Sequence, residues 1–278
     1  MHRITRRRLL GVAGVAGLAA AAPVLDAVAA QDASLGGLPP VEKDVVFGKG
    51  GATDLRCDLY RPRPGTEKRL ATIHLHGGGF AGGSKETLVE RVRPYAERGS
   101  LAVVPQYRLT GQAGWPAMIE DVKTAIRWTR ANASRLGIDP ARLVIVGYSA
   151  GGHLALTATG TQNDPGIEGT GGNAGAGTEV AACVAYYPVS EGGPPPSASP
   201  ISLVTGSFAP TVIFHGVADT TVPLESSQRL FQRLRDVNVP SELHTFAGAP
   251  HVFDRDPALA SACGHLADLF LGRHLKTT

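Results

Sequence analysis

The sequence predicts an α/β fold: a mostly parallel sheet of about eight strands with helices on both faces. Two observations carry this expectation. Short apolar runs of strand length alternate with longer helical segments, which is the pattern of parallel strands joined by right-handed crossovers. One run, L-V-I-V at residues 143–146, is wholly apolar, as expected for a strand buried on both faces. With 278 residues, 43% of them hydrophobic, the chain is long enough for one large domain.

Each element is placed by its own pattern. Two strands, joined by the turn signal G-K-G-G, form an expected hairpin at 41–48 and 54–61. The further strands are expected at 70–75, 101–106, 143–146, 181–187, 211–215 and 242–246. The helices are expected at 87–98, 115–136, directly after 147–151, 223–237 and 257–274.

Two helices need comment. In the segment 115–136 apolar side chains recur at helical spacing, and Gly137 is well placed to end the helix. In the segment 87–98, Pro94 is expected to break or kink the helix because proline lacks a backbone N–H. A Gly-rich stretch at 166–177 has no periodicity and is interpreted as a surface loop.

The first 30 residues are interpreted as an export signal. A basic start (T-R-R-R-L-L, 5–10), a mild apolar stretch and the small-residue sequence A-V-A-A (27–30) are its three expected parts. The arginine pair resembles that of a twin-arginine signal. A permanent membrane anchor fits less well, because the apolar run is short, contains Pro23 and stops at Asp26. The chain is therefore divided into a signal at 1–30, which would export the protein to the periplasm or beyond, and one domain at 31–278.

Charge and cysteine content narrow the class. The net charge of +3 is accounted for by four arginines and one aspartate within the first 30 residues, so the remainder is neutral. A neutral body has no electrostatic signature of a nucleic-acid or anionic-membrane partner. Three cysteines, Cys57, Cys183 and Cys263, leave at least one free thiol, and the sequence cannot pair the others.

A nucleophile elbow is predicted at G-Y-S-A-G, residues 147–151. A serine in a G-x-S-x-G turn between a strand and a helix is held in strained geometry with its hydroxyl exposed. Here the apolar strand 143–146, the motif and a helical segment follow in that order. The alternative, a simple Gly-rich turn, explains the motif but not its context. Ser149 is therefore the candidate nucleophile.

A second motif, H-G-G-G-F at residues 76–80, follows the strand 70–75. Acyl transfer passes through an oxyanion that needs preoriented donors, and glycine lets bare backbone N–H groups approach it. The N–H of Ala150, after the nucleophile, is a further donor in this arrangement. A phosphate-binding loop is the alternative, but the stretch lacks the G-K-[ST] ending and the G-x-G-x-x-G spacing. Gly82 and Gly83, further along, receive no role.

The remaining catalytic groups are predicted from two loops that follow neighbouring strands. H-G-V-A-D ends in Asp219 and A-P-H-V-F contains His251, and the order Ser, Asp, His is that of the hydrolase elbow enzymes. Asp219 would orient the His251 ring, which would take the proton of Ser149.

Other acids and histidines fit less well. Asp236 is expected inside a helix, Glu225 at a helix start, and Asp254 too close to His251 in sequence. Six other histidines are expected in a strand, in helices or before the glycines: His244, His153, His265, His274, His74 and His76. We expect His76 to brace the glycine loop. No metal site is predicted, because H-E-x-x-H, C-x-x-C and calcium-loop patterns are missing from the sequence.

Taken together, five motifs resemble those of the α/β-hydrolase esterases over residues 41–275. They are H-G-G-G-F, Q-Y-R-L (106–109), G-Y-S-A-G-G-H-L-A, H-G-V-A-D and G-A-P-H-V-F. The closest likeness is to the branch of hormone-sensitive-lipase-like carboxylesterases and bacterial feruloyl-esterase-like enzymes. The resemblance implies the α/β-hydrolase fold and no cofactor. It implies the triad Ser149, Asp219 and His251, with oxyanion donors at Gly78, Gly79 and Ala150.

Two departures from the family pattern stand out. Many members have glycine before the catalytic histidine, where this chain has Pro250, which fixes the local backbone. Larger members carry a helical cap, but only about twenty residues, rich in Pro and Gly, join the strands 181–187 and 211–215. The sequence therefore predicts no substantial cap domain and an open pocket poorly suited to long acyl chains.

The functional hypothesis is a serine carboxylesterase acting on short-acyl or aryl esters, either small molecules or groups linked to a polysaccharide. An amidase, an arylformamidase or a peptidase would use the same triad on the same fold. A non-catalytic binding protein with this fold is a further alternative.

Overall fold

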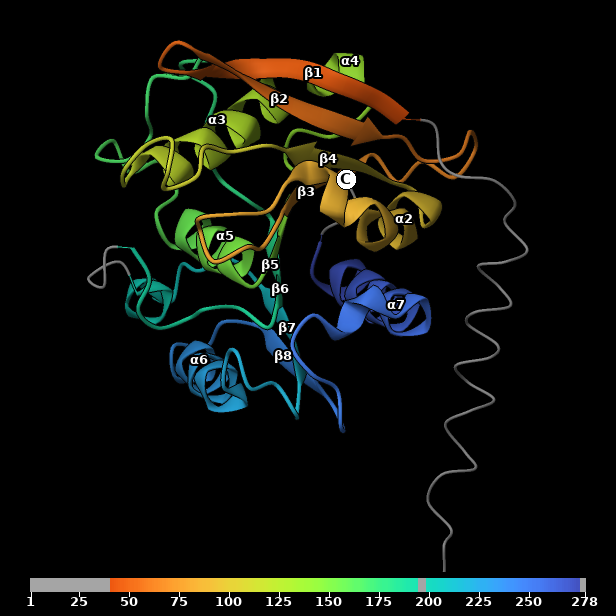
Figure 1. The fold of residues 1–278 in the computed structure, drawn as a ribbon. Helices are drawn as coiled ribbons and strands as arrows, with labels where there is room; N and C mark the ends of the chain where they lie inside the picture. The colour runs from red at the N-terminus through yellow and green to blue at the C-terminus, as the bar shows by residue number, and fades with distance from the viewer. Residues whose placement is uncertain (1–40, 195–198, 276–278) are drawn as a thin grey trace, which may run out of the picture.

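A computed structural model describes residues 41–194 and 199–275, and it confirms the predicted mostly parallel sheet. Figure 1 shows the fold. The predicted export signal, residues 1–30, lies outside the described residues. The strands are β1 (Val41–Gly50), β2 (Thr53–Tyr60), β3 (Leu70–Leu75), β4 (Ser100–Pro105), β5 (Leu143–Tyr148), β6 (Ala182–Tyr186), β7 (Thr211–Gly216) and β8 (Ser241–Phe246).

The strand order is β1-β2-β4-β3-β5-β6-β7-β8. The pairs β1–β2 and β2–β4 are antiparallel, and every later pair is parallel. Strand β3 lies between β4 and β5, so the chain leaves β2, passes the position of β4 to form β3, and returns to form β4 beside β2. The strands β5 to β8 then follow in order on the other side of β3. Because β3 to β8 are parallel, their carboxyl ends meet at one edge, where open α/β sheets bind ligands.

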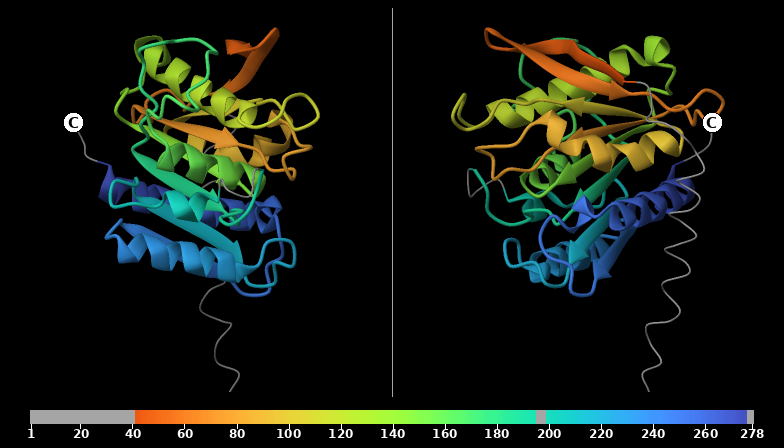
Figure 2. Two further views of the ribbon diagram at one scale, coloured as in Figure 1. Left: turned by 90° about the vertical axis from the view of Figure 1, so that its left-hand side faces the viewer. Right: turned by 45° about the vertical axis from the view of Figure 1, so that its right-hand side comes forward.

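Helices cover both faces of the sheet, as Figures 1 and 2 show. On one face lie α2 and α7, and on the other α3, α5 and α6. The helical elements are η1 (Lys85–Leu88), α2 (Val89–Glu97), α3 (Ala117–Ala131), α4 (Ala133–Leu136), α5 (Ala150–Gly160), η3 (Pro200–Leu203), α6 (Leu224–Asp236), η4 (Phe253–Arg255) and α7 (Pro257–His274).

Two hydrophobic cores result from this layering. Strand side chains alternate between faces, so in β5 Ile145 packs under α3 and α5 while Val144 and Val146 pack under α2 and α7. All of β5 is buried, as the apolar run predicted. The central strands are buried between the two cores, and the loops that contain the predicted site residues follow their carboxyl ends.

The predicted helix 115–136 is wrong in one respect, because the structure divides it into α3 and α4. The break falls at Asn132, whose φ of −98° and ψ of 13° lie outside the helical region. Its backbone N–H and its side-chain Nδ2 both donate to the carbonyl of Trp128. Asparagine competes in this way for backbone groups, which an apolar pattern alone does not reveal.

The predicted helix 87–98 is present, with a short 3-10 turn, η1, before α2. Pro94 lies inside α2 and does not end it, since the helix continues to Glu97. The interpretation of 166–177 as a loop agrees with the structure, but this loop is anchored. The buried Lys123 donates to Glu168 Oε1 at 2.8 Å, and Arg127 pairs with Glu168 Oε2 at 2.6 Å.

The connection from β6 to β7 contains the short η3 and, in the residues described, no cap domain. This agrees with the predicted open pocket. Cys57, Cys183 and Cys263 are buried and free. Within 41–194 and 199–275, no helix is long and apolar enough to cross a membrane.

A fully buried histidine makes the stability of this fold depend on pH. His74 in β3 lies within hydrogen-bond distance of Thr72 Oγ1 (2.9 Å) and the Tyr148 hydroxyl (3.3 Å), and burial lowers its pKa to about 3. The unfolded chain binds this proton near pH 6.5, whereas the folded chain resists it down to about pH 3. Folding stability should therefore fall as pH falls through that window.

The expected slope is up to about 1.4 kcal/mol per pH unit for this one group. Urea unfolding at a series of pH values between 7 and 4 measures it. The His74→Asn variant should show a shallower dependence than the wild type over the same window. Equal slopes in the two proteins would contradict the assignment to His74.

Candidate active site

Ser149 occupies a strained turn between β5 and α5. Its φ of 55° and ψ of −116° are sterically unfavourable for a residue with a side chain. The glycines on either side are required by contact. A Cβ on Gly147 would lie 2.1 Å from the Gly151 carbonyl oxygen, and one on Gly151 would lie 2.1 Å from the Leu75 carbonyl oxygen. The turn therefore has the geometry of the predicted nucleophile elbow.

The structure brings the three predicted catalytic side chains together. His251 Nε2 lies 3.0 Å from Ser149 Oγ, and His251 Nδ1 lies 2.6 Å from Asp219 Oδ2. Asp219 follows β7, and His251 follows the edge strand β8. The Asp219 side chain is fully buried, while 15% of the His251 side chain is exposed. The arrangement can move a proton from the serine hydroxyl onto an imidazole whose other nitrogen faces a carboxylate.

Asp219 is held on both of its oxygens. Oδ1 accepts the backbone N–H groups of Thr221 and Val222, each at 2.9 Å. Oδ2 faces His251, and His215 Nε2 lies 3.3 Å from the same oxygen. His215 is buried, which lowers its pKa, and its Nδ1 is 2.7 Å from Ser227 Oγ. These contacts fix the direction in which Asp219 faces His251.

The glycine loop lies against the elbow. A Cβ on Gly77 would come within 2.9 Å of the Tyr148 carbonyl oxygen and 3.1 Å of the Ser149 Cβ. Gly78 and Gly79 have positive φ values of 128° and 61°. In the described part of the chain, the backbone N–H groups of Gly78, Gly79 and Ala150 have no hydrogen-bond partner. All three residues line the same pocket as Ser149, so these donors are available to a ligand there.

His76 supports this loop, as expected. Its Nδ1 lies 2.8 Å from the Gly77 carbonyl oxygen, and its ring stacks on Tyr107 with centroids 4.2 Å apart. The Tyr107 hydroxyl donates to the His76 carbonyl at 2.6 Å, and Gln106 Nε2 lies 3.2 Å from His76 Nε2. The Q-Y-R-L segment therefore acts as a brace for the glycine loop.

Gly83, left without a role by the sequence, closes the loop. Its φ is 92°, and a Cβ there would lie 2.1 Å from the Gly77 carbonyl oxygen and 2.6 Å from His76 Nδ1. Gly82 is different, because a Cβ there would meet only the Gly78 carbonyl oxygen, at 3.6 Å. Gly82 contributes a backbone N–H that donates to the Gly78 carbonyl at 2.9 Å, which any residue except proline could supply.

This difference yields a matched pair of variants. Gly83→Ala should lower the free energy of unfolding by about 2–3 kcal/mol, because it adds a clash with backbone and a strained φ. Gly82→Ala should change it by less than about 0.5 kcal/mol. Urea unfolding of both variants and the wild type measures the two values. A Gly83→Ala protein as stable as Gly82→Ala would show that the loop relaxes freely.

The pocket in front of Ser149 has a volume of about 460 Å³. Its wall includes the glycine loop, the elbow and the His251 loop, together with three residues that sequence reasoning missed: Arg91, Tyr187 and Arg255. Arg91 comes from α2 and Tyr187 from the loop after β6, and no local motif marks either of them. A helical residue can be placed at a site only when the packing of its helix is known.

Behind His251 lies a buried polar group that includes Asp254. The Tyr187 ring meets the His251 ring edge-on, with centroids 4.6 Å apart, and the Tyr187 hydroxyl donates to Asp254 Oδ1. Burial raises the pKa of Asp254. Rejecting Asp254 as the triad acid agrees with the structure, where Asp219 occupies that position. What the sequence did not indicate is that Asp254 holds the tyrosine against which His251 rests.

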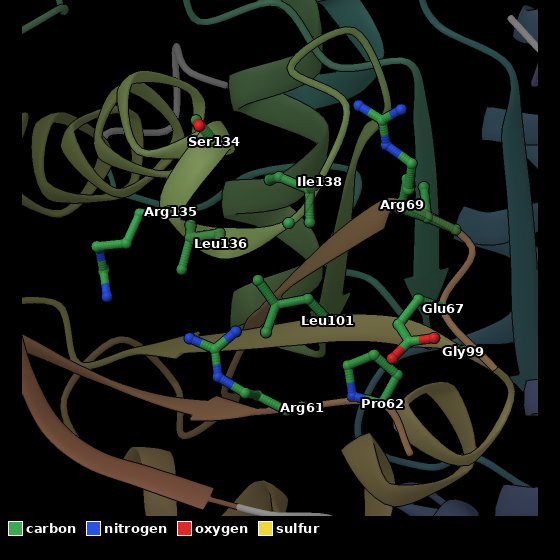
Figure 3. Close-up of a pocket in the computed structure, with 12 residues that line it drawn as sticks. Arg61, Pro62, Glu67, Arg69, Gly99, Leu101, Ser134, Arg135, Leu136 and Ile138 are labelled. Atoms are coloured by element: carbon green, nitrogen blue, oxygen red, sulfur yellow. The ribbon is translucent and has the colours of Figure 1, made fainter. Parts of the chain in front are cut away.

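A second pocket, of about 260 Å³, lies at the opposite edge of the sheet, where β3 and β4 begin (Figure 3). Its floor includes Leu101, and three arginines, Arg61, Arg69 and Arg135, stand around it. In Figure 3 their guanidinium groups lie apart and do not converge on one point. This pocket contains none of the predicted catalytic residues, so we place the candidate active site at the carboxyl edge.

In the part of the chain that the structure describes, no group of three or more His, Cys, Asp or Glu side chains is arranged to hold a metal ion. The chemistry that this site can perform with its own residues is nucleophilic. A serine, a histidine and a carboxylate are linked in series beside three unpaired backbone donors. On a sheet of this strand order, such a site defines the α/β-hydrolase class.

Comparison with known proteins agrees with this class. The BD-FAE family model matches residues 57–192, and the Prolyl oligopeptidase family model matches residues 196–277. Esterase LipQ of Mycobacterium tuberculosis is 29% identical over 84% of this chain and 63% of its own length. Esterase LipC of the same organism is 30% identical over 75% of this chain and 59% of its own length. The chain thus spans less than two thirds of these relatives.

Solved structures show the same likeness. The native structure of esterase Est2 from Thermogutta terrifontis has a TM-score of 0.75 and 29% identity, over 86% of this chain and 93% of its own. The same esterase phosphorylated by paraoxon has a TM-score of 0.76 and 29% identity, over 85% of this chain and 95% of its own. The chain therefore shares the α/β-hydrolase fold of these solved structures, and the relatives named here are esterases.

Proposed function

We propose that this protein is a serine carboxylesterase. Ser149 Oγ attacks the ester carbonyl while His251 Nε2 takes its proton, and Asp219 stabilises the imidazolium that forms. The N–H groups of Gly78, Gly79 and Ala150 meet the oxyanion. His251 then gives the proton to the departing alkoxide, which leaves an acyl-serine. A water molecule, deprotonated by His251, hydrolyses the acyl-enzyme and restores Ser149.

The observation that carries this proposal is the continuous series from Asp219 through His251 to Ser149, at 2.6 and 3.0 Å, beside three unpaired backbone donors. The nucleophile lies within hydrogen-bond distance of the general base, and the general base lies within hydrogen-bond distance of the carboxylate that orients it. The esterase relatives support the same reaction.

The substrates we propose are short-acyl or aryl esters, as small molecules or as groups on a polysaccharide. The pocket has no cap over it in the described residues, so bulky alcohol groups can extend into solvent. A long acyl chain would stay partly exposed and gain little from burial. We also propose that residues 1–30 export the protein, which would place it beside extracellular esters.

The test uses 4-nitrophenyl esters of increasing acyl length with the full chain. We expect turnover of the acetate and the butyrate and a steep fall in kcat/KM beyond medium chains. A fluorophosphonate probe should label Ser149 in the folded protein. A protein inert toward a broad ester panel, with Ser149 unlabelled, would instead indicate a non-catalytic binding role.

A second candidate function is peptide hydrolysis, favoured by the match of residues 196–277 to the Prolyl oligopeptidase family. Amide hydrolysis would use the same three side chains but needs a protonated leaving amine. Chromogenic peptide and anilide substrates, offered beside matched esters, decide between the two. Faster cleavage of the amides than of the esters would favour the peptidase or amidase function.

A further inference from the structure

The wall of the active-site pocket carries two arginines and no carboxylate. Arg91 of α2 and Arg255 of η4 both line the cavity that contains Ser149. Both arginines therefore bring positive charge to the cavity in which a substrate must lie. Neither residue belongs to the predicted triad or to the glycine loop.

Arg91 is 9% exposed, and its Nε and Nη2 atoms are buried without a hydrogen-bond partner among the residues that the structure describes. Its Nε lies 2.9 Å from Asp254 Oδ2, close enough for an ion pair, but the N–H direction leaves both atoms without a hydrogen bond. The guanidinium also lies over the Tyr148 ring, 5.3 Å from its centroid. Because the ion pair with Asp254 leaves these N–H groups without a hydrogen bond, an acceptor that reaches the guanidinium would be bound strongly.

Arg255 is exposed, and within 41–194 and 199–275 it has no ion pair or hydrogen bond from its side chain. The nearby acids do not face the cavity. Asp219 is fully buried behind His251, and Asp254 accepts the Tyr187 hydroxyl on its other oxygen. The charged side chains that line the pocket are therefore two arginines, of which Arg91 is paired with Asp254 and Arg255 is not paired with a described residue.

We infer that the pocket contains a subsite for a carboxylate group of the substrate, formed by Arg91 and Arg255. The preferred substrates are then acidic esters, such as hemiesters of dicarboxylic acids or esters whose alcohol part carries a carboxylate. Guanidinium groups suit this ligand because their planar N–H donors match the two oxygens of a carboxylate. The inference rests on the proposed esterase function and specifies its substrate class.

Two pairs of substrates test the inference, one for each side of the ester. The acyl pair is mono(4-nitrophenyl) adipate against 4-nitrophenyl hexanoate, which differ by a terminal carboxylate. The alcohol pair is 4-acetoxybenzoate against 4-acetoxybenzamide, which have nearly the same shape. In at least one pair we expect kcat/KM for the anionic ester to exceed that for the neutral one by about ten-fold, the effect of a charged hydrogen bond. Added salt should reduce this ratio.

Arginine variants assign the ratio to the subsite. Arg255→Gln should lower the anionic-to-neutral ratio by about two- to five-fold, the effect expected for an exposed pair. Arg91→Lys keeps a cation beside Asp254 but loses the planar donors, and should lower the ratio by about ten-fold. The matched control is Arg235→Gln, an exposed arginine of α6 outside the pocket, which should leave the ratio unchanged.

The outcomes separate the subsite from the esterase function. Turnover of neutral esters with a ratio of one or less in both pairs, or a ratio that neither arginine variant changes, would overturn the subsite alone. No turnover of any ester would count against the esterase function. Calorimetric binding of the four esters to Ser149→Ala tests the subsite independently of turnover. Tighter binding of an anionic ester that is weakened by Arg255→Gln supports it, and equal binding within both pairs overturns it.

Discussion

Replacing Ser149 by alanine should lower kcat/KM for 4-nitrophenyl butyrate by about five orders of magnitude. The reason is that Ser149 Oγ is the atom that His251 Nε2 faces at 3.0 Å, and alanine has no hydroxyl to replace it. The residual rate would come from the backbone donors and from substrate binding. Steady-state hydrolysis, followed by the absorbance of the released nitrophenolate, measures the loss.

The control for this variant is its fold. Alanine has the same Cβ as serine, so the strained turn and the free energy of unfolding should change little. Unfolding in urea and labelling by a fluorophosphonate probe should show a folded protein that no longer reacts. Wild-type turnover by Ser149→Ala would disprove the assignment of the nucleophile.

The second large effect is expected from Asp219→Asn, which should lower kcat by about four orders of magnitude. Thr221 and Val222 donate to Oδ1 and would hold the amide oxygen of the new residue on their side. The amide nitrogen would then face His251 Nδ1, and Nδ1 would have to accept a hydrogen bond from the amide N–H. The neutral ring then carries its single N–H proton on Nε2, so Nε2 can no longer accept the proton of Ser149.

A matched variant separates this effect from a general loss of charge. Asp236→Asn, at the exposed end of α6, removes the same charge far from the pocket and should leave kcat within about two-fold. Steady-state kinetics of both variants across pH 6–9 or so make the comparison. A fall of less than ten-fold for Asp219→Asn would mean that another carboxylate orients His251.

The sheet could be predicted almost residue by residue because its strands have clear local signals. Buried parallel strands are continuous apolar runs, and β3 coincides with the predicted 70–75. Helix α7 likewise coincides with 257–274, where Asp256 caps the first turn by accepting from two backbone N–H groups. The helix break at Asn132 was not predicted, because it depends on the hydrogen bonds that the Asn132 side chain and backbone make to the Trp128 carbonyl. Apolar periodicity carries no information about such hydrogen bonds.

The candidate site divides in the same way. Ser149, Asp219 and His251 could be predicted because each follows a strand at a position fixed by topology, and the structure brings them together. Arg91 and Tyr187 could not, because they reach the pocket through the packing of α2 and the course of the loop after β6. The role of Gly83 could not be predicted either, because a Cβ at this position would clash with the Gly77 carbonyl oxygen. That contact depends on a turn whose shape the sequence does not specify.

The backbone around this pocket is strained at three residues, and at one of them the strain is tied to the reactive group. Ser149, Tyr187 and Val252 all have positive φ values, 55°, 36° and 60°, although none of them is glycine. Each such residue costs about 1–3 kcal/mol, which the buried sheet beneath must offset. Glycine at position 149 would relieve the strain and remove the nucleophile. Selection for thermal stability and selection for hydrolysis therefore act on this one residue in opposite directions, and a more stable variant of this protein must gain its stability elsewhere.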